Sequence, residues 1–237
     1  MNAVFAIDPR HDPVILAATF ARVGRIRISD FLVRDAAEML HDELAASTAW
    51  RRVINGKAKV FEISRADFAS LDSDHRLQIQ DKITAASLEG FQFNYETIRI
   101  SDDAIERGGS GTTLDAFLDF MNGDDVRQFF RDVTHATRLD LIDGQATAYG
   151  PGDFLTCHDD NVAGKHRLGA YVLGLTKNWQ QQWGGALQFH ADPPDAWTPE
   201  FNTLALFAVP QQHSVDRVNH DADRLRLSVT GWLRSHS

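Results

Sequence analysis

The sequence predicts an α+β protein with a helix-rich first half and a strand-rich second half. Up to about residue 137, apolar residues mostly recur every three or four positions, which is typical of helices. Beyond that point, short apolar runs alternate with Gly, Pro and Asn. Strands at this spacing are typical of an all-β sandwich or a jelly roll, so we expect the second half to form such a core.

Length and composition indicate a single globular domain over residues 1–237, with 1–137 as helix-rich support and 138–237 as the strand-rich core. Hydrophobic residues make up 43% of the chain and charged residues 24%, which excludes a disordered or collagen-like protein. The single cysteine, Cys157, excludes an intramolecular disulfide and fits a reducing compartment.

Charge and hydropathy limit the classes of partner that the protein can be expected to bind. The net charge is -9 and no run is rich in Lys or Arg, so we expect no direct binding of nucleic acid. No apolar run approaches the length of a membrane span, and the first residues lack the pattern of a signal peptide. We therefore expect a cytoplasmic protein that does not contact a membrane.

Periodicity and turn residues define the elements of the first half. Helices are expected over 14–22, 35–47, 72–90, 113–121 and 124–135, and strands over 25–32, within 53–63 around a turn at Asn55-Gly56, and over 91–100. The segment 102–112 contains Gly108, Gly109 and Gly111 and is expected to be a mobile loop.

The second half is expected to consist of strands joined by short turns. They are predicted over 139–149, 153–158, 168–176, 185–190, 203–209 and 226–234.

The motif His158-Asp159-Asp160 ends one of these strands. Residues i and i+2 of a strand point to the same face, so His158 and Asp160 can direct an imidazole and a carboxylate at one point. A third ligand from a distant strand would complete a set of two histidines and one carboxylate. That set leaves open positions on the metal and is typical of non-haem Fe(II) oxygenases.

A second His-x-Asp pair, His190 and Asp192, weakens the motif as a signal, since either pair alone also fits a surface position. His190 runs into two prolines that indicate a loop leaving the sheet, which favours His158 and Asp160. The distant histidine is sought among His213, His220 and His236. His236 is nearly terminal, and His220 lies in a polar stretch. His213 follows the apolar run 203–209, but an ordinary histidine at the edge of the core explains it equally well.

The last predicted strand places Arg226, Ser228 and Thr230 on one face. An arginine facing the interior of a barrel needs a carboxylate partner. A dicarboxylate cosubstrate would provide one through a two-pronged hydrogen bond. The alternative is that Arg226 lies exposed on an edge strand.

In chain order, Tyr149, His158-x-Asp160, Gly184-Gly185-x-Leu187, His213 and the run from Arg226 to Trp232 resemble the 2-oxoglutarate- and Fe(II)-dependent prolyl hydroxylases. The resemblance is densest over 146–234. It extends more loosely to Asp30-Phe31-Leu32 and to 91–95. The segments 155–160 and 226–232 are most similar to the ribosomal prolyl-hydroxylase branch of fungi and animals and its bacterial relatives.

This resemblance implies a double-stranded β-helix, or jelly-roll, core and an iron-dependent dioxygenase. It makes His158, Asp160 and His213 the Fe(II) ligands, Arg226 the partner of the distal carboxylate of 2-oxoglutarate, and Tyr149 a residue lining the cosubstrate pocket. It places Trp183-Gly184-Gly185 at the start of a core strand. The resemblance also implies a reaction that uses O2 and releases succinate and CO2, with ascorbate as a candidate further cofactor. The implied substrate is a prolyl residue of a protein, with a ribosomal or translation protein as the candidate.

One position departs from the family pattern. Many relatives have a tyrosine that binds the cosubstrate where this chain has Gly174, and Tyr171 lies on the other face of an ideal strand. A water molecule or Ser228 is the expected replacement.

Two other functions stay open: hydroxylation of a small molecule such as a free amino acid, and a non-catalytic module that senses iron or 2-oxoglutarate. A peptide substrate would need an open groove, which the segments 102–112 and 160–168 could border.

Overall fold

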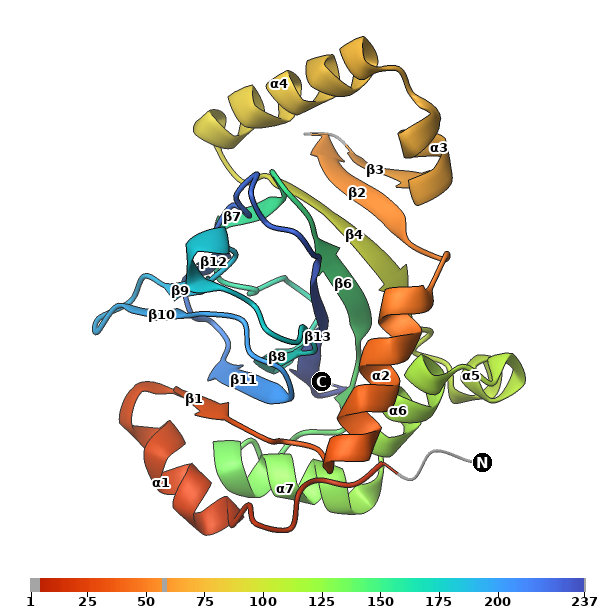
Figure 1. Cartoon of the computed structure of the whole chain (residues 1–237). Coiled ribbons are helices and arrows are strands. Elements are labelled where there is room, and N and C mark those ends of the chain that lie inside the picture. Colours follow the sequence, from red (N-terminus) through yellow and green to blue (C-terminus); the bar gives the residue numbers. More distant parts are fainter. Residues whose placement is uncertain (1–4, 57–58, 237) are drawn as a thin grey trace.

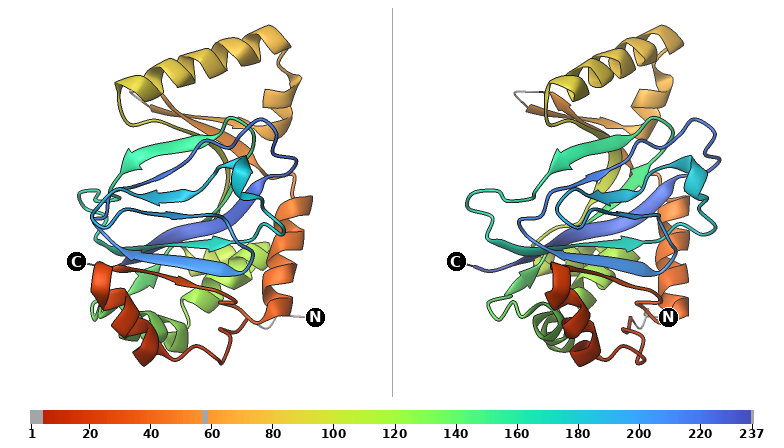
Figure 2. Two further views of the ribbon diagram at one scale, coloured as in Figure 1. Left: turned by 60° about the vertical axis from the view of Figure 1, so that its left-hand side comes forward. Right: turned by 90° about the vertical axis from the view of Figure 1, so that its left-hand side faces the viewer.

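The computed structural model describes residues 5–56 and 59–236. A strongly curled antiparallel sheet occupies the middle of the molecule, and the helices lie along one side of it and at its two ends (Figures 1 and 2). The helices are α1 (Pro13–Val23), α2 (Arg34–Ala46), α3 (Arg65–Ser70), α4 (Ser73–Glu89), α5 (Ala104–Ser110), α6 (Thr113–Met121), α7 (Asp124–Thr134) and the 3-10 helix η1 (Gln181–Trp183). The predicted fold class, α+β with a jelly-roll core, is confirmed.

The strands of the first half are β1 (Arg25–Ile28), β2 (Arg51–Gly56), β3 (Lys59–Ser64) and β4 (Phe93–Arg99). Those of the second half are β5 (Leu141–Ile142), β6 (Gln145–Tyr149), β7 (Phe154–His158), β8 (Arg167–Gly174), β9 (Leu187–Phe189), β10 (Asp195–Trp197), β11 (Thr203–Ala208), β12 (His213–Val215) and β13 (Arg226–Arg234). The main path of the sheet runs β1-β11-β8-β13-β6-β4-β7-β12-β9-β10. Strands of the helix-rich half therefore belong to the same sheet as the jelly-roll strands.

The two faces of the sheet have different neighbours. On one face Leu173 and Val229 join a core with α2, α6 and α7, which includes the fully buried Phe117 and Phe130. On the other face Phe189 and other apolar residues of the curled strands form a smaller cluster beside a cavity. Alternation along each strand thus separates a packing face from a face that is free to line a site.

The predicted loop over 102–112 is wrong, because residues 104–110 form α5. The Asp103 side chain accepts a hydrogen bond from the backbone N–H of Ile105 and caps the helix. Arg107 is buried and donates to Asp119 at 2.8 Å and to the carbonyl oxygen of Ser101 at 2.7 Å. Gly111 then ends the helix in the left-handed conformation, with φ 66°.

Several strand boundaries also differ from the predicted ones. The strand predicted over 25–32 ends at Ile28, and β9 begins at Leu187 rather than at Trp183, which ends a 3-10 turn. β10 and β12 are not predicted, because three residues are too few to show alternation. Asn55 and Gly56 end β2, and the connection at 57–58 lies outside the described residues.

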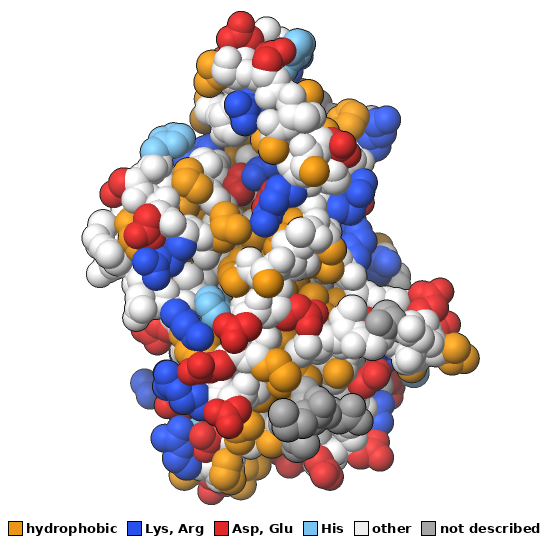
Figure 3. Space-filling model, turned by 45° about the vertical axis from the view of Figure 1, so that its right-hand side comes forward, with side chains coloured by type: hydrophobic (Ala, Val, Ile, Leu, Met, Phe, Trp, Pro, Cys, Tyr) orange, Lys and Arg blue, Asp and Glu red, His pale blue; other side chains and the backbone are white. Residues whose placement is uncertain are grey.

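The surface carries both signs of charge. On the face drawn in Figure 3, Lys and Arg side chains are interspersed with Asp and Glu. Over the described residues, no helix is both long enough and apolar enough to cross a membrane.

Candidate metal centre and its pocket

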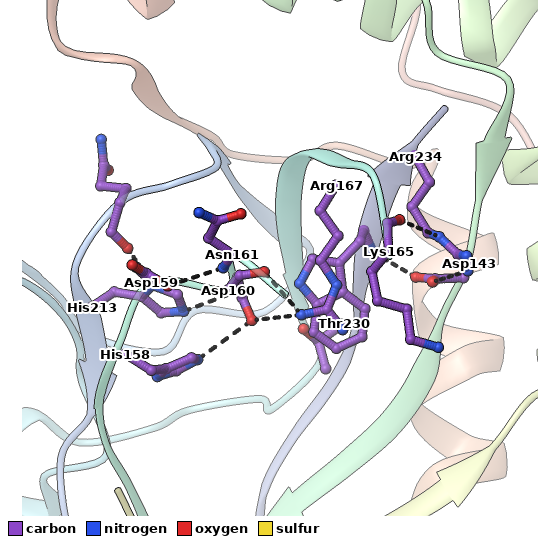
Figure 4. Close-up of polar contacts among 12 residues, drawn as sticks. Asp143, His158, Asp159, Asp160, Asn161, Lys165, Arg167, His213, Thr230 and Arg234 are labelled. Atoms are coloured by element: carbon purple, nitrogen blue, oxygen red, sulfur yellow. Dashed lines mark hydrogen bonds and ion pairs between the residues drawn. The ribbon is translucent and has the colours of Figure 1, made fainter. Parts of the chain in front are cut away.

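Two neighbouring strands bring three potential metal ligands together. His158 ends β7 and His213 begins β12, and the antiparallel register pairs these two residues directly. Asp160 follows β7, with Oδ1 3.6 Å from His158 Nε2 and Oδ2 3.4 Å from His213 Nε2 (Figure 4). Within the described part of the chain, no other group of three such side chains could hold a metal ion.

The route by which Asp160 reaches this point differs from the predicted strand alternation. β7 ends at His158, and Asp160 adopts the left-handed conformation, with φ 62°. This conformation is uncommon for residues other than glycine. A turn of the backbone therefore directs the carboxylate toward the two imidazoles. His213 likewise opens its own strand instead of trailing the apolar strand β11.

The hydrogen bonds of the two histidines suit them for metal binding. His158 Nδ1 lies 3.0 Å from the carbonyl oxygen of Thr156, and His213 Nδ1 lies 2.7 Å from that of Gln211. A carbonyl oxygen can only accept, so each Nδ1 carries the proton. Each Nε2 then has a free lone pair on the side of Asp160. Metal-bound histidines are generally fixed in this way.

The pKa shifts of His213 and Asp160 also favour metal binding. Burial, together with the neighbouring His158, lowers the pKa of His213 to about 4. Burial by itself would raise the pKa of Asp160, but the contacts with His158 and His213 outweigh burial and lower the pKa overall. At neutral pH, His213 is a neutral donor and Asp160 a carboxylate, a set that fits a divalent cation.

The three side chains face a cavity of about 380 Å³. Its rim includes Phe91 and Val162, both half exposed, and its wall continues to Arg226 and Ser228, which are buried. Arg226, Ser228, Thr230 and Trp232 all line it, as the predicted alternation along this strand requires. The cavity is therefore large enough for a small ligand beside the His-Asp-His cluster.

Arg226 is buried without a carboxylate partner among the described residues. Its side chain is 4% exposed, its guanidinium carbon lies 5.0 Å from the centre of the Tyr149 ring, and its Nε atom has no hydrogen-bond partner. Burial lowers the pKa of Arg226 from its ordinary value. A buried cation of this kind is costly unless an anion pairs with it, so its surroundings fit a carboxylate ligand.

A row of small side chains lies next to Arg226. Across β4, β6, β13, β8 and β11, the residues in register are Thr97, Thr147, Ser228, Gly174 and Thr203. The hydroxyl groups of Thr147 and Ser228 are 2.8 Å apart. Of this row, Thr147 and Ser228 line the cavity and provide hydroxyl groups at its buried end.

The missing tyrosine has a structural explanation. A Cβ atom on Gly174 would lie 2.3 Å from the carbonyl oxygen of Glu200, so the backbone of Glu200 occupies that space. Tyr171 is on the opposite face, where its hydroxyl donates to the carbonyl oxygen of Asp143 at 3.0 Å. Neither residue lines the cavity beside the His-Asp-His cluster.

Tyr95 is a pocket residue that the sequence prediction missed. Its ring stacks on Tyr149, with centroids 5.0 Å apart and planes 20° apart. Phe91, Phe93 and Tyr95 all line the cavity. Their spacing of two residues, read as one face of a strand, was a usable signal.

The other candidate ligands do not join the cluster. His190 is exposed, and its Nε2 lies 2.9 Å from the hydroxyl group of Ser214. His220 and His236 are exposed as well.

Comparisons with known proteins agree with the fold and the site. Residues 144–234 match the family model described as the 2OG-Fe(II) oxygenase superfamily. The chain is 31% identical over 124 residues to a Xenopus laevis protein named prolyl 3-hydroxylase OGFOD1, and 30% identical over 120 residues to that of Mus musculus. The alignments cover 48% and 46% of this chain but only 24% and 22% of those proteins, so the chain spans about a quarter of their length.

Solved structures show the same fold. A Pseudomonas putida prolyl-4-hydroxylase superposes with a TM-score of 0.64 at 22% identity, covering 95% of this chain and all of that one. A Trichoplax adhaerens prolyl hydroxylase, solved with a peptide fragment of the hypoxia inducible factor oxygen degradation domain, has a TM-score of 0.56 at 17% identity. It covers 94% of this chain and 89% of that one.

The segment 144–234 is thus similar to the 2OG-Fe(II) oxygenase superfamily, and the fold agrees with that similarity. The two curated relatives and the two solved structures described above are prolyl hydroxylases, which confirms the resemblance seen in the sequence.

Proposed function

We propose that this protein is a dioxygenase that uses Fe(II) and 2-oxoglutarate to hydroxylate a prolyl residue of a protein. The proposal depends on one observation: the His-Asp-His cluster and the unpaired Arg226 face the same cavity. A protein that only binds a metal ion has no need for a buried arginine without a carboxylate. An oxygenase that binds a dicarboxylate beside its metal needs both.

Each residue then has a defined task. His158, Asp160 and His213 would hold Fe(II) and leave positions open. Arg226 would bind the distal carboxylate of 2-oxoglutarate through a two-pronged hydrogen bond. When bound, Fe(II) and 2-oxoglutarate supply the oxidising chemistry, which consumes O2, releases succinate and CO2 and adds a hydroxyl group to the substrate.

Three side chains would shape the cosubstrate end of the cavity. Tyr149 covers the guanidinium of Arg226 with its ring. Burial raises the pKa of Tyr149 well above its usual value, so its hydroxyl group stays neutral. Ser228, with Thr147 beside it, offers a hydroxyl group on the same wall and takes the role that the missing tyrosine has in relatives.

The proposed substrate follows from the relatives. The curated proteins that this chain resembles are named prolyl 3-hydroxylases, and one solved neighbour holds a peptide. The exposed Phe91 and Val162 at the rim would suit the apolar ring of a proline. A ribosomal or translation protein as the target is supported by the sequence resemblance alone.

Mass spectrometry of a cell extract tests this function. The extract is incubated with the protein, Fe(II), 2-oxoglutarate and ascorbate, and a gain of one oxygen atom on a prolyl peptide is expected. His158→Ala and Arg226→Ala serve as inactive controls. Hydroxylation confined to free amino acids would replace the protein substrate with a small molecule. Binding of 2-oxoglutarate without turnover on any substrate would support a sensing module.

A further inference from the structure

We infer that Arg167 is a positioning residue that fixes the orientation of the Asp160 carboxylate toward the two histidines. The inference rests on the proposed function and adds a residue that acts through a ligand rather than on the substrate. Arg167 begins β8 and lines the cavity beside the His-Asp-His cluster.

One nitrogen of Arg167 bridges the main chain and the side chain of Asp160. Its Nη1 donates to the carbonyl oxygen of Asp160 at 3.1 Å and to Oδ1 of the same residue at 3.3 Å. Figure 4 shows the guanidinium on the side of Asp160 away from the two histidines. The contact therefore holds the backbone and the carboxylate orientation together.

The guanidinium itself is held from another side. Its carbon lies 3.5 Å from the centre of the Trp232 ring, and the side chain is 14% exposed. Arg167 and Trp232 belong to the paired strands β8 and β13, so the backbones of both residues are held by the hydrogen bonds of the sheet. Arg167 can therefore act as a fixed reference for Asp160, which lies beyond the end of its strand.

Asp160 needs such a reference because its backbone is left-handed, a conformation disfavoured for a side chain with a Cβ atom. Each carboxylate oxygen lies beside one histidine: Oδ1 is 3.6 Å from His158 Nε2, and Oδ2 is 3.4 Å from His213 Nε2. The hydrogen bond from Arg167 to Oδ1 therefore fixes how the carboxylate faces the two imidazoles.

Charge alone predicts the opposite effect on metal affinity. A guanidinium close to the site repels a divalent cation, so its removal would tighten metal binding. Positioning predicts that its removal weakens metal binding, because the ligand loses its fixed orientation. Whether the loss of Arg167 raises or lowers the metal affinity therefore distinguishes a positioning role from a purely electrostatic one.

The experiment is a titration of Mn2+, an ion that does not oxidise in air, into the metal-free full-length protein. Arg167→Met is expected to weaken Mn2+ binding about 10- to 100-fold. Arg167→Lys keeps one nitrogen that can bridge the same two oxygens, and is expected to recover most of the affinity. With Mn2+ saturating, Arg167→Met should also bind 2-oxoglutarate more weakly. Thermal unfolding of each metal-free variant verifies that it is folded.

Arg217→Met is the matched control. Arg217 stacks on Phe154 at 4.1 Å and donates to the carbonyl oxygen of Gly152 at 2.6 Å. Like Arg167 it therefore contacts an aromatic ring and a main-chain carbonyl, but it touches no candidate ligand. Unchanged or tighter Mn2+ binding by Arg167→Met would overturn the inference, as would an equal loss in the control. Failure of the wild-type protein to bind Mn2+ would instead overturn the proposed function.

Discussion

Arg226 and Tyr149 face each other on neighbouring strands, with the guanidinium carbon 5.0 Å from the centre of the phenol ring. Both side chains are buried, and the ring covers the guanidinium on one side. No carboxylate among the described residues pairs with Arg226, so its fork of N–H groups is available to a ligand in the cavity.

Replacement of Arg226 should therefore weaken the binding of 2-oxoglutarate. Lys offers a point charge without the fork, so Arg226→Lys as well as Arg226→Ala should lose affinity. The loss of a charged hydrogen bond in a buried site costs about 2–4 kcal/mol, or roughly 30- to 1000-fold. The measurement is titration of 2-oxoglutarate into the anaerobic Fe(II) protein. Iron binding should stay nearly unchanged, and wild-type affinity in both variants would refute the cosubstrate assignment.

The two His-x-Asp pairs should differ sharply. His158→Ala or Asp160→Ala should abolish Fe(II)-dependent turnover of 2-oxoglutarate and weaken metal binding, because each removes one of the three clustered ligands. His190→Ala and Asp192→Ala are matched controls and should leave both nearly intact. Metal titration with circular dichroism as a check of folding measures this. Equal losses at both pairs would contradict the assignment.

The metal-free protein should lose stability as the pH falls from about 6.5 to about 4. The pKa of His213 is about 4 in the fold and 6.5 in the reference state, so in this interval only the unfolded chain takes up the proton. Stability is therefore complete above the upper value, and the loss is complete below the lower one. The shift corresponds to roughly 3 kcal/mol at most. The folded-state pKa of Asp160 lies below 3.8, outside this interval.

Denaturant unfolding of wild type and His213→Asn at a series of pH values isolates this effect. The difference between the two free energies of unfolding should change across the interval, because other titrating groups contribute to both proteins. A constant difference would show that His213 does not titrate as its burial requires.

Loss of Arg52 should destabilise the protein strongly. Arg52 on β2 donates to Asp153 at 2.6 Å, and Asn94 donates to the same carboxylate oxygen at 2.8 Å. Asp153 is 2% exposed, so Arg52→Met leaves a buried carboxylate without its cation. A loss of about 3–5 kcal/mol in the free energy of unfolding is expected.

Arg34→Met provides the comparison for Arg52. Arg34 is largely exposed and pairs with Glu38 one helical turn away, a pair worth about 0.5 kcal/mol. Chemical denaturation measures both variants. A loss at Arg52 no larger than that at Arg34 would show that the buried pair does not support the turn between Tyr149 and β7.

The parts of the fold that repeat a local pattern could be predicted from the sequence. Helices such as 35–47 and strands such as 226–234 follow from periodicity, and the face shared by Arg226 and Ser228 follows from strand alternation. The order of motifs along the second half then indicated the class of the protein.

Features that depend on tertiary contacts could not be predicted in this way. β12 has three residues and exists because it pairs with β7 and β9. Asp160 reaches the site through a left-handed turn that no spacing rule reveals. The glycines of α5 suggested a loop, but the cap at Asp103 and the buried Arg107 stabilise a helix.

Gly174 limits how this chain could change over evolutionary time. Any larger residue at this position would overlap the main chain at Glu200, since even a Cβ atom would come within 2.3 Å of its carbonyl oxygen. A tyrosine there cannot be gained by one substitution without moving the segment around Glu200. Residue 174 and the segment around Glu200 would have to change together. A sequence in which only residue 174 had changed would be less stable than either the present chain or the doubly changed one.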